Sequence, residues 1–301
     1  MKFAHISDCH LGAWQHNEEL CKLNLQAFLI ALDICLTKKV DFVLIAGDLL
    51  NTPTPDLAIV ESAVRKMKEL KDSGVEFYMI LGSHDYSPNV RAITDVLSSA
   101  GFIAPVMHCE ERDGRLVLNC IRDPKTGAIL AGLSGKRRGE DAEDFLRLDT
   151  HHIQREKGFK LFAFHNYLSG IAPSEIPGIP SLPLENLPRG FDYYAGGHPH
   201  KKQQYDSQYY RHVVPSRRWR VAQLAANEYP CFGKATLQSW ARNILVNIGH
   251  SQIPVGADPR PYATPGQPPI SNQFCHLISS PINSDGDRFG FVAALRALKP
   301  N

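Results

Sequence analysis

Five short apolar segments of this 301-residue chain each end in residues that can bind a metal ion. Each segment has the length and composition of a buried β-strand. The residues that close these segments are Asp8 and His10, then Asp48, then Ser83 with His84 and Asp85, then His165, and finally His198 with His200. The carboxyl ends of parallel strands form the edge where α/β folds build their sites, so one sheet edge can gather all of these side chains.

Each of these positions also has an ordinary structural explanation when it is taken alone. Asp48 follows a glycine and can cap a helix, His165 can be a hydrogen-bonded core histidine, and GGHPH can form a turn. Those explanations require five independent coincidences at equivalent positions. Imidazoles and carboxylates without cysteine form the ligand set expected for manganese, iron or zinc ions. The sequence therefore predicts a metal centre, and glycines before Asp48, Ser83 and His198 permit close approach of the backbone.

Strand-like and helix-like patterns alternate through the first two hundred residues. Strands are expected in KFAHIS, VDFVLIAGD, VEFYMILG, RLVLNCIRD, AILAGLSG, FKLFAFH and FDYYAGGH, and helices over 18–38, 57–70, 89–99 and 140–148. Residues 124–127 form the turn of an expected hairpin. In the first helix the expected buried stripe consists of Leu20, Leu23, Ala27, Ile30, Ala31 and Ile34. A parallel half followed by a β-rich half predicts the α/β class, as a four-layer α/β/β/α sandwich of two mixed sheets.

Composition restricts the class of protein further. Hydrophobic residues make up 43% and charged residues 21%, and the net charge of +2 provides no strong overall attraction to polyanions. Seven scattered cysteines without a CxxC pair indicate a reducing compartment. MKFAHISD reaches charge too early for a secretory signal, and no stretch approaches the roughly 20 apolar residues of a membrane helix. We therefore expect a cytoplasmic protein without a membrane partner.

The order of the metal-binding blocks resembles the calcineurin-like metallophosphoesterases. DxH, GD, GSHD in place of GNHD, a lone histidine after an apolar strand and GHxH follow one another across nearly two hundred residues. Within that superfamily, KFAHISDCHLG, GDLLNTP and GGHPHKK are most similar to the SbcD-type nuclease subunits that process DNA double-strand breaks, and GSHDYSP has an archaeal character. The fold implied is the metallophosphoesterase sandwich.

The resemblance implies two divalent metal ions, usually manganese in this family. The ligands it assigns are Asp8, His10 and His200 for the first ion, Asp48 for both ions, and Ser83, His165 and His198 for the second ion. It gives His84 the catalytic role of orienting the scissile phosphate or protonating the leaving oxygen. Asp85 and Asn51 are expected behind these groups, Asp85 holding a histidine or the loop.

Two positions depart from the pattern of the family. Serine at position 83 replaces an asparagine whose amide oxygen is a better neutral ligand than a hydroxyl, so we expect a weaker second site. Asn51 stands where several relatives carry a histidine, and this difference is expected to change the balance between exonuclease and endonuclease action.

The function implied is a manganese-dependent DNA nuclease that acts as an exonuclease on duplex ends and an endonuclease on single strands. The implied partners are DNA and a coiled-coil ABC ATPase of the SbcC type, and a homodimer is compatible with the resemblance. Lys201 and Lys202 follow the last ligands and are expected to contact DNA phosphates. Two alternatives stay open: a small-molecule phosphodiesterase or phosphatase, and a catalytically weakened DNA-binding accessory subunit.

The chain is expected to divide near residue 215. Residues 1–214 form the expected metallophosphoesterase nuclease domain, and 215–301 a divergent or truncated cap region with a proline-rich tail. The seven prolines from Pro254 to Pro281 disfavour regular helix and central strands in that tail.

Overall fold

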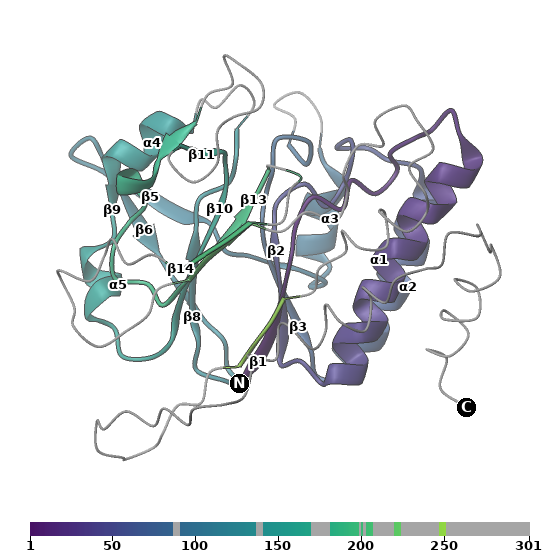
Figure 1. Cartoon of the computed structure of the whole chain (residues 1–301), viewed down its shortest axis with the longest axis horizontal. Coiled ribbons are helices and arrows are strands. Elements are labelled where there is room, and N and C mark those ends of the chain that lie inside the picture. The colour runs from purple at the N-terminus through teal and green to yellow at the C-terminus, as the bar shows by residue number, and fades with distance from the viewer. Residues whose placement is uncertain are drawn as a thin grey trace, which may run out of the picture.

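Two mixed β-sheets lie face to face at the centre of the protein. The computed structural model describes residues 1–86, 91–136, 141–169, 181–198 and 200, with the backbone of strands at 203–206, 220–223 and 247–250. Figure 1 shows the two sheets side by side, with helices on both outer sides. The predicted α/β/β/α sandwich of two mixed sheets is confirmed.

The first sheet carries the amino-terminal strands. Its strands in spatial order are β16 (Asn247–His250), β1 (Lys2–Ile6), β2 (Phe42–Ala46), β3 (Glu76–Ile80) and β4 (Ala104–Pro105). β1 to β4 run parallel, and β16 pairs with β1 in the antiparallel sense. The carboxyl ends of β1, β2 and β3 therefore lie along one edge of this sheet.

The second sheet carries the later strands. Its strands in spatial order are β14 (Gln203–Asp206), β15 (Arg220–Gln223), β13 (Tyr193–Gly197), β10 (Lys160–His165), β8 (Ile129–Gly132) and β7 (Ile121–Arg122). β8, β10, β13 and β15 run parallel, while β7 and β14 are antiparallel to their neighbours. The antiparallel pair β7–β8 confirms the hairpin predicted around 124–127.

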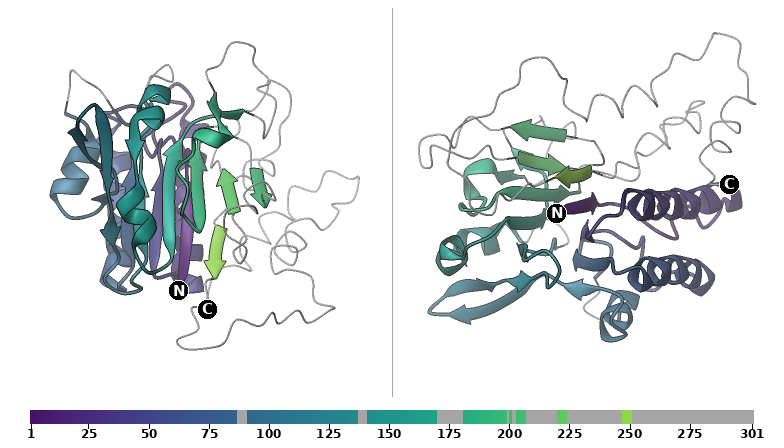
Figure 2. Two further views of the ribbon diagram at one scale, coloured as in Figure 1. Left: turned by 90° about the vertical axis from the view of Figure 1, so that its left-hand side faces the viewer. Right: turned by 90° about the horizontal axis from the view of Figure 1, so that it is seen from below.

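Helices cover the outer faces of both sheets (Figures 1 and 2). The first sheet packs against α1 (Glu18–Lys38), α2 (Leu57–Asp72) and α3 (Ile93–Ser99). The second packs against α4 (Ala142–Arg147), α5 (His151–Arg155) and a small sheet of β5 (His108–Arg112), β6 (Arg115–Asn119) and β9 (Leu148–Asp149). The remaining described elements are the strand pair β11 (Leu168–Ser169) and β12 (Leu182–Pro183), and a 3₁₀ turn at Leu184–Asn186.

Apolar residues follow one another without interruption in these strands because both faces of each strand are buried. Along β2, Phe42, Leu44 and Ala46 belong to the core between the two sheets. Val43 and Ile45 alternate with them and pack under the helices. A strand covered on both sides needs no polar face, which explains why FVLIA contains no polar residue.

Helix α1 corrects two expectations. Of the six residues in its predicted stripe, only Ala27 and Ala31 are buried, and the buried face also contains Asn24, Phe28, Leu32 and Cys35. Apolar residues occur on several sides of this helix, so their spacing does not select one face. The expectation that no segment has the length and composition of a membrane helix is also wrong for the 21 residues of α1. In the structure, α1 connects the parallel strands β1 and β2 and packs against the sheet.

The segment RLVLNCIRD was predicted to form one strand and forms two. β6 pairs with β5 in the small sheet, whereas β7 pairs with β8 in the second central sheet. The two pieces pair in different sheets, so pairing rather than local propensity decides where each strand begins and ends. The proline-containing segment 173–188 contains β12 and the 3₁₀ turn within its described part.

Several predictions concern residues that are not described. α3 begins at Ile93 instead of residue 89, and residues 87–90 lie outside the described part of the chain. The proposed boundary near 215 and the proline-rich segment 254–281 also lie outside it, and both stay predictions.

Candidate metal centre

The carboxyl ends of five strands, from both central sheets, converge on one cluster of side chains. Acids and imidazoles form three overlapping groups, and within each group the potential ligand atoms lie within 4.8 Å of one another. The groups are Asp8, His10 and His200, then His10, Asp48 and His84, and then Asp48, His165 and His198. Each of these residues was singled out from its position after an apolar strand, and the fold brings together residues as far apart in the chain as Asp8 and His200.

The first group is centred on two imidazole nitrogens. Nε2 of His10 lies 3.1 Å from Nε2 of His200, which is 3.6 Å from an Asp8 carboxylate oxygen. Two nitrogens bound to one ion at right angles, each about 2.1 Å from it, are about 3 Å apart. The observed spacing therefore suits a shared cation.

The third group is centred on Asp48 and His165. Nε2 of His165 lies 3.1 Å from Oδ2 of Asp48, and the same oxygen lies 3.7 Å from Nε2 of His10. The His198 ring completes the group, with its centroid 5.1 Å from that of His165. Asp48 thus belongs to the second group as well as to the third. From such a position one carboxylate can serve two ions.

His165 tests whether a cation fits between these ligands. Its Nδ1 donates to the carbonyl oxygen of Ala46 at 2.8 Å, so in the neutral ring Nε2 carries a lone pair. Within the described part of the chain that nitrogen makes no hydrogen bond of normal geometry, although it faces the carboxylates of Asp48 and Asp8. A lone pair facing two carboxylates is repelled unless a proton or a metal ion lies between them, so these donors fit a cation.

The electrostatics of the cluster agree with this interpretation. Burial on its own lowers the pKa of His165, but the charges of Asp48 and Asp8 outweigh it and raise the pKa to about 10. Burial also lowers the pKa of His10 and of His198 to about 3. The two latter rings are therefore neutral and can donate lone pairs, while the two carboxylates require a positive charge nearby.

The ligands lie on turns with unusual backbone conformations. The φ angles of Asp8, His10, Asp48 and His198 are 53°, 44°, 51° and 89°, all in the left-handed region. Main-chain bonds from Asp8 to Gly47 and from His10 to Asp48, both 3.0 Å, join the first two turns. The amide of His198 donates to both oxygens of Asp8, at 3.0 and 3.1 Å. These bonds hold conformations that each cost about 1–3 kcal/mol.

His84 projects into the cluster from the turn after β3. Its amide donates to Oδ1 of Asp48 at 2.8 Å, and its ring lies 4.7 Å from that of His10, nearly perpendicular to it. Nδ1 of His84 donates to the carbonyl oxygen of Asn51 at 2.9 Å, which leaves Nε2 available. Asn51 therefore contacts His84 through its main chain.

Asp85 lies behind the cluster and is fully buried. Its carboxylate accepts hydrogen bonds from the amides of Leu49, Leu50 and Gly82 at 3.3, 2.9 and 2.9 Å. Burial and the neighbouring Asp48 raise its pKa to about 7, and the amides act against this. Of the two roles expected for Asp85, holding a histidine or holding the loop, its contacts are those of a residue that holds the loop.

Two glycines allow the strands to approach the ligands. A Cβ atom on Gly197 would lie 2.3 Å from the carbonyl oxygen of Ala46 and 2.6 Å from Nδ1 of His165. A Cβ atom on Gly82 would lie 2.2 Å from Oδ1 of Asp48. Both distances are far below van der Waals contact, so only glycine fits at these positions.

Ser83 lies half-buried in the same turn as His84, and its role as a ligand stays a prediction. Lys201 and Lys202 lie outside the described residues. Sequence reasoning missed Tyr167, whose ring packs against His198 with centroids 4.6 Å apart and an interplanar angle of 77°. The available signal was its position two residues after His165, on the same side of an extended chain.

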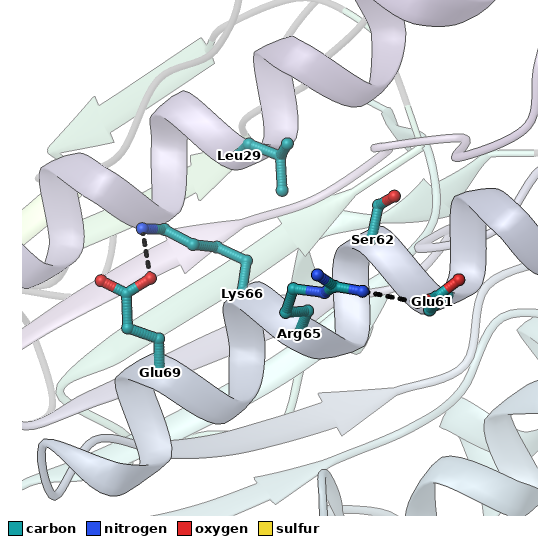
Figure 3. A pocket seen from close by; sticks show the side chains of 6 residues that line it. All are labelled: Leu29, Glu61, Ser62, Arg65, Lys66 and Glu69. Carbon is teal, nitrogen blue, oxygen red and sulfur yellow. Dashed lines mark hydrogen bonds and ion pairs between the residues drawn. The ribbon is translucent and has the colours of Figure 1, made fainter.

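A separate hollow of about 430 Å³ lies between α1 and α2 (Figure 3). The residues that line it are Leu29, Glu61, Ser62, Arg65, Lys66 and Glu69. Ion pairs join Arg65 to Glu61 and Lys66 to Glu69, and Lys66 also pairs with Asp33. None of these residues belongs to the candidate metal centre.

The part of the chain that contains the side chains of the candidate metal centre also matches a known family. The calcineurin-like phosphoesterase family matches residues 1–202. The chain is 29% identical over 201 residues to a DNA double-strand break repair protein Mre11 from Sulfurisphaera tokodaii, covering 66% of this chain and 48% of the relative. It is 30% identical over 206 residues to the protein of the same name from Aeropyrum pernix, covering 66% and 49%.

The chain thus spans about half the length of these two relatives. Among solved structures, the calcineurin-like phosphoesterase YfkN from Bacillus subtilis is 12% identical with a TM-score of 0.42, covering 75% of this chain and 81% of the other. At that TM-score, the likeness adds nothing to the argument from sequence.

Proposed function

Because this chain belongs to the calcineurin-like family of metal-dependent phosphoesterases, we propose that it hydrolyses phosphodiester bonds of DNA in double-strand break repair. The relatives named above are DNA double-strand break repair proteins by name, which supports DNA as the substrate. The single observation that supports this chemistry is that acids and imidazoles from five strand ends converge. In each of the groups they form, the potential ligand atoms lie within 4.8 Å of one another.

Two divalent ions, proposed to be Mn²⁺, would occupy the two groups of ligands. Asp8, His10 and His200 would hold the first, His165 and His198 the second, with Ser83 as an additional weak ligand and Asp48 between the two. Bound there, the ions would neutralise charge on the phosphate and activate water. Neutral imidazoles at His10 and His198 and ionised Asp48 are the forms that bind metal, and the surroundings of the three side chains favour these forms.

His84 is proposed to act on the leaving group. The bond from its Nδ1 to the Asn51 carbonyl fixes the tautomer, so Nε2 is the nitrogen that donates or accepts a proton at the substrate. Proton transfer from an imidazole held within hydrogen-bond reach of the leaving oxygen contributes about 10²–10⁴-fold to a rate.

The wider biological setting is also proposed. Lys201 and Lys202 follow the last ligand along the chain, so contact with DNA phosphates is proposed for them. A coiled-coil SbcC-type ATPase is the proposed partner, the proposed site of action is the cytoplasm, and a homodimer is compatible with this assignment. Residues 1–214 are the proposed nuclease domain, and residues 215–301 are the proposed cap region and tail.

The test compares substrates under one set of metal conditions. End-labelled duplex DNA, single-stranded circular DNA and bis-p-nitrophenyl phosphate are incubated with the protein and Mn²⁺, with and without chelator. The proposal expects cleavage of both DNA substrates, loss of cleavage with chelator, and a loss of at least about 100-fold in Asp48→Asn. Glu61→Gln, in the exposed hollow beside α2 and outside the candidate metal centre, is the matched control and keeps the wild-type rate.

Each alternative gives a different result in this assay. Hydrolysis of bis-p-nitrophenyl phosphate with intact DNA identifies a small-substrate phosphodiesterase. DNA binding with no hydrolysis of any substrate identifies an accessory subunit. Either result overturns the proposed nuclease.

A further inference from the structure

The buried face of helix α1 contains one polar side chain, Asn24, which is 2% exposed. Its buried neighbours on the helix are Ala27, Phe28, Ala31, Leu32 and Cys35. Asparagine is a poorer helix former than leucine, and burying an amide costs free energy unless it is hydrogen-bonded. A side chain of this kind on an apolar face calls for a physical reason.

The Asn24 amide binds the turn that carries the first two metal-ligand candidates. Its Nδ2 donates to the carbonyl oxygen of Cys9 at 2.8 Å in the protein interior. Cys9 lies between Asp8 and His10, whose φ angles of 53° and 44° are both in the left-handed region. A fixed Cys9 carbonyl restricts rotation of the Cys9–His10 peptide plane and so constrains the turn that carries both side chains.

The other ligand turn has a comparable support from a different residue. Asp85 accepts three amide hydrogen bonds from the Asp48 turn and from Gly82. The two turns are joined by main-chain bonds, but each one is also held from behind by its own buried polar side chain. Asn24 supports the Asp8–His10 turn in the way that Asp85 supports the Asp48 turn.

The Asn24 side chain leaves one of its polar atoms unpaired, since its Oδ1 makes no hydrogen bond within the described part of the chain. A leucine at this position would bury apolar surface and remove the unpaired Oδ1, but it would also take away the donor that the buried Cys9 carbonyl oxygen has in Asn24. The benefit of the amide therefore lies in its contact with the Cys9 turn, which points to a role in the site.

We propose that Asn24 is a positioning residue for the first metal site, holding Asp8 and His10 in the orientation that binds the ion. This inference rests on the proposed function, because it takes Asp8, His10 and His200 as ligands. Partners that orient metal ligands typically contribute about 10–100-fold to metal affinity. The effect is expected at the first site only, since the second is held through Asp48, His165 and His198.

The experiment measures Mn²⁺ binding by the electron paramagnetic resonance signal of the free ion. His198→Ala isolates the first site and His200→Ala the second, and Asn24→Leu is added to each. The expected result is at least about 10-fold weaker binding in the His198→Ala background, and binding within about 2-fold in the His200→Ala background. Asn24→Asp, which keeps the shape but removes the donor, is expected to weaken the first site similarly.

Stability separates positioning from a merely structural role. Asn24→Leu is expected to weaken the first site while changing the melting temperature of the metal-free protein by no more than Leu32→Ala does. Leu32→Ala, on the same buried face, is the matched control that lowers the melting temperature and keeps Mn²⁺ affinity. Unchanged first-site affinity in both Asn24 variants overturns the inference alone, whereas absence of Mn²⁺ binding in the unmodified protein overturns the metal assignment and the inference together.

Discussion

Replacement of Gly197 by alanine tests whether close packing of strand β13 positions His165. The added Cβ would lie 2.3 Å from the Ala46 carbonyl oxygen and 2.6 Å from Nδ1 of His165. Ordinary contacts begin near 3.4 Å, so the overlap is about 1 Å. Relief requires His165 to move away from Ala46, which breaks the 2.8 Å hydrogen bond between them.

Two free-energy costs add in this variant. Overpacking a well-packed interior costs about 1–3 kcal/mol, and a lost buried hydrogen bond costs about 1–3 kcal/mol more. Gly197→Ala is therefore expected to lower the free energy of unfolding by about 2–6 kcal/mol. A ligand displaced by about 1 Å is expected to reduce the rate of phosphodiester hydrolysis about 100-fold, beyond any loss from unfolded protein.

The assay combines urea unfolding with kcat/KM for bis-p-nitrophenyl phosphate in Mn²⁺, under conditions where the variant is folded. Gly74→Ala is the control, because a Cβ there meets nothing within 4 Å while its φ of +80° is unfavourable for alanine. It should lose about 1–2 kcal/mol of stability and no activity. Folded Gly197→Ala with kcat/KM within about 2-fold of the unmodified protein would refute the reasoning.

Three further predictions concern the same region. Asn51→Ala should change kcat/KM by less than about 3-fold, because Asn51 contacts His84 through its carbonyl oxygen, whereas His84→Ala should lose about 10²–10⁴-fold; equal losses in steady-state kinetics would contradict this contact. Burial lowers the pKa of His5 from 6.5 to about 3. Between these two pH values, His5 binds a proton in the unfolded chain but not in the folded chain. The free energy of unfolding should therefore fall as the pH drops below about 6.5, by about 2 kcal/mol from this group at pH 5, and His5→Phe should have a flatter profile in urea titrations. Finally, Mn²⁺ at about 100 times its dissociation constant should stabilise the fold by about 2.7 kcal/mol, measured as a rise in melting temperature that chelator reverses; an unchanged melting temperature would show that the ion does not prefer the folded state.

The parallel strands and the residues at their ends could be predicted from sequence because both follow from local pattern. The apolar run that ends at Gly47 and Asp48 is visible in the sequence itself. Parallel topology then places the carboxyl ends of such strands, and the acids that follow them, along the same edge of a sheet. The same logic places His165 and His198 at neighbouring strand ends without any knowledge of distances.

The hairpin of β5 and β6 was missed although its turn is written in the sequence. Asp113 and Gly114 have φ angles of 49° and 75°, as a two-residue hairpin turn requires. The strand before this turn, HCEER, is mostly charged and exposed, so it lacks the apolar alternation by which strands are recognised.

Contacts that depend on distance could not be predicted from sequence. Asn51 was expected behind the site, but only the fold shows that its carbonyl oxygen accepts a hydrogen bond from His84. Tyr167 against His198 and Asn24 under Cys9 likewise join residues from different elements. Asn24 lies within a helix, and Tyr167, although it follows an apolar strand, is not one of the residue types that bind metal ions, which were the signal used to find the ligands.

The distribution of backbone strain connects these observations. Within the described part of the chain, seven residues other than glycine have positive φ, and four of them are Asp8, His10, Asp48 and His198. Strained residues of this kind cost about 1–3 kcal/mol each and persist only where their surroundings hold them. Here the surroundings are buried groups that serve no other evident purpose, such as the Asn24 amide and the Asp85 carboxylate. A chain selected for stability alone would relax these turns, so their retention is explained by a cation whose binding free energy offsets the strain.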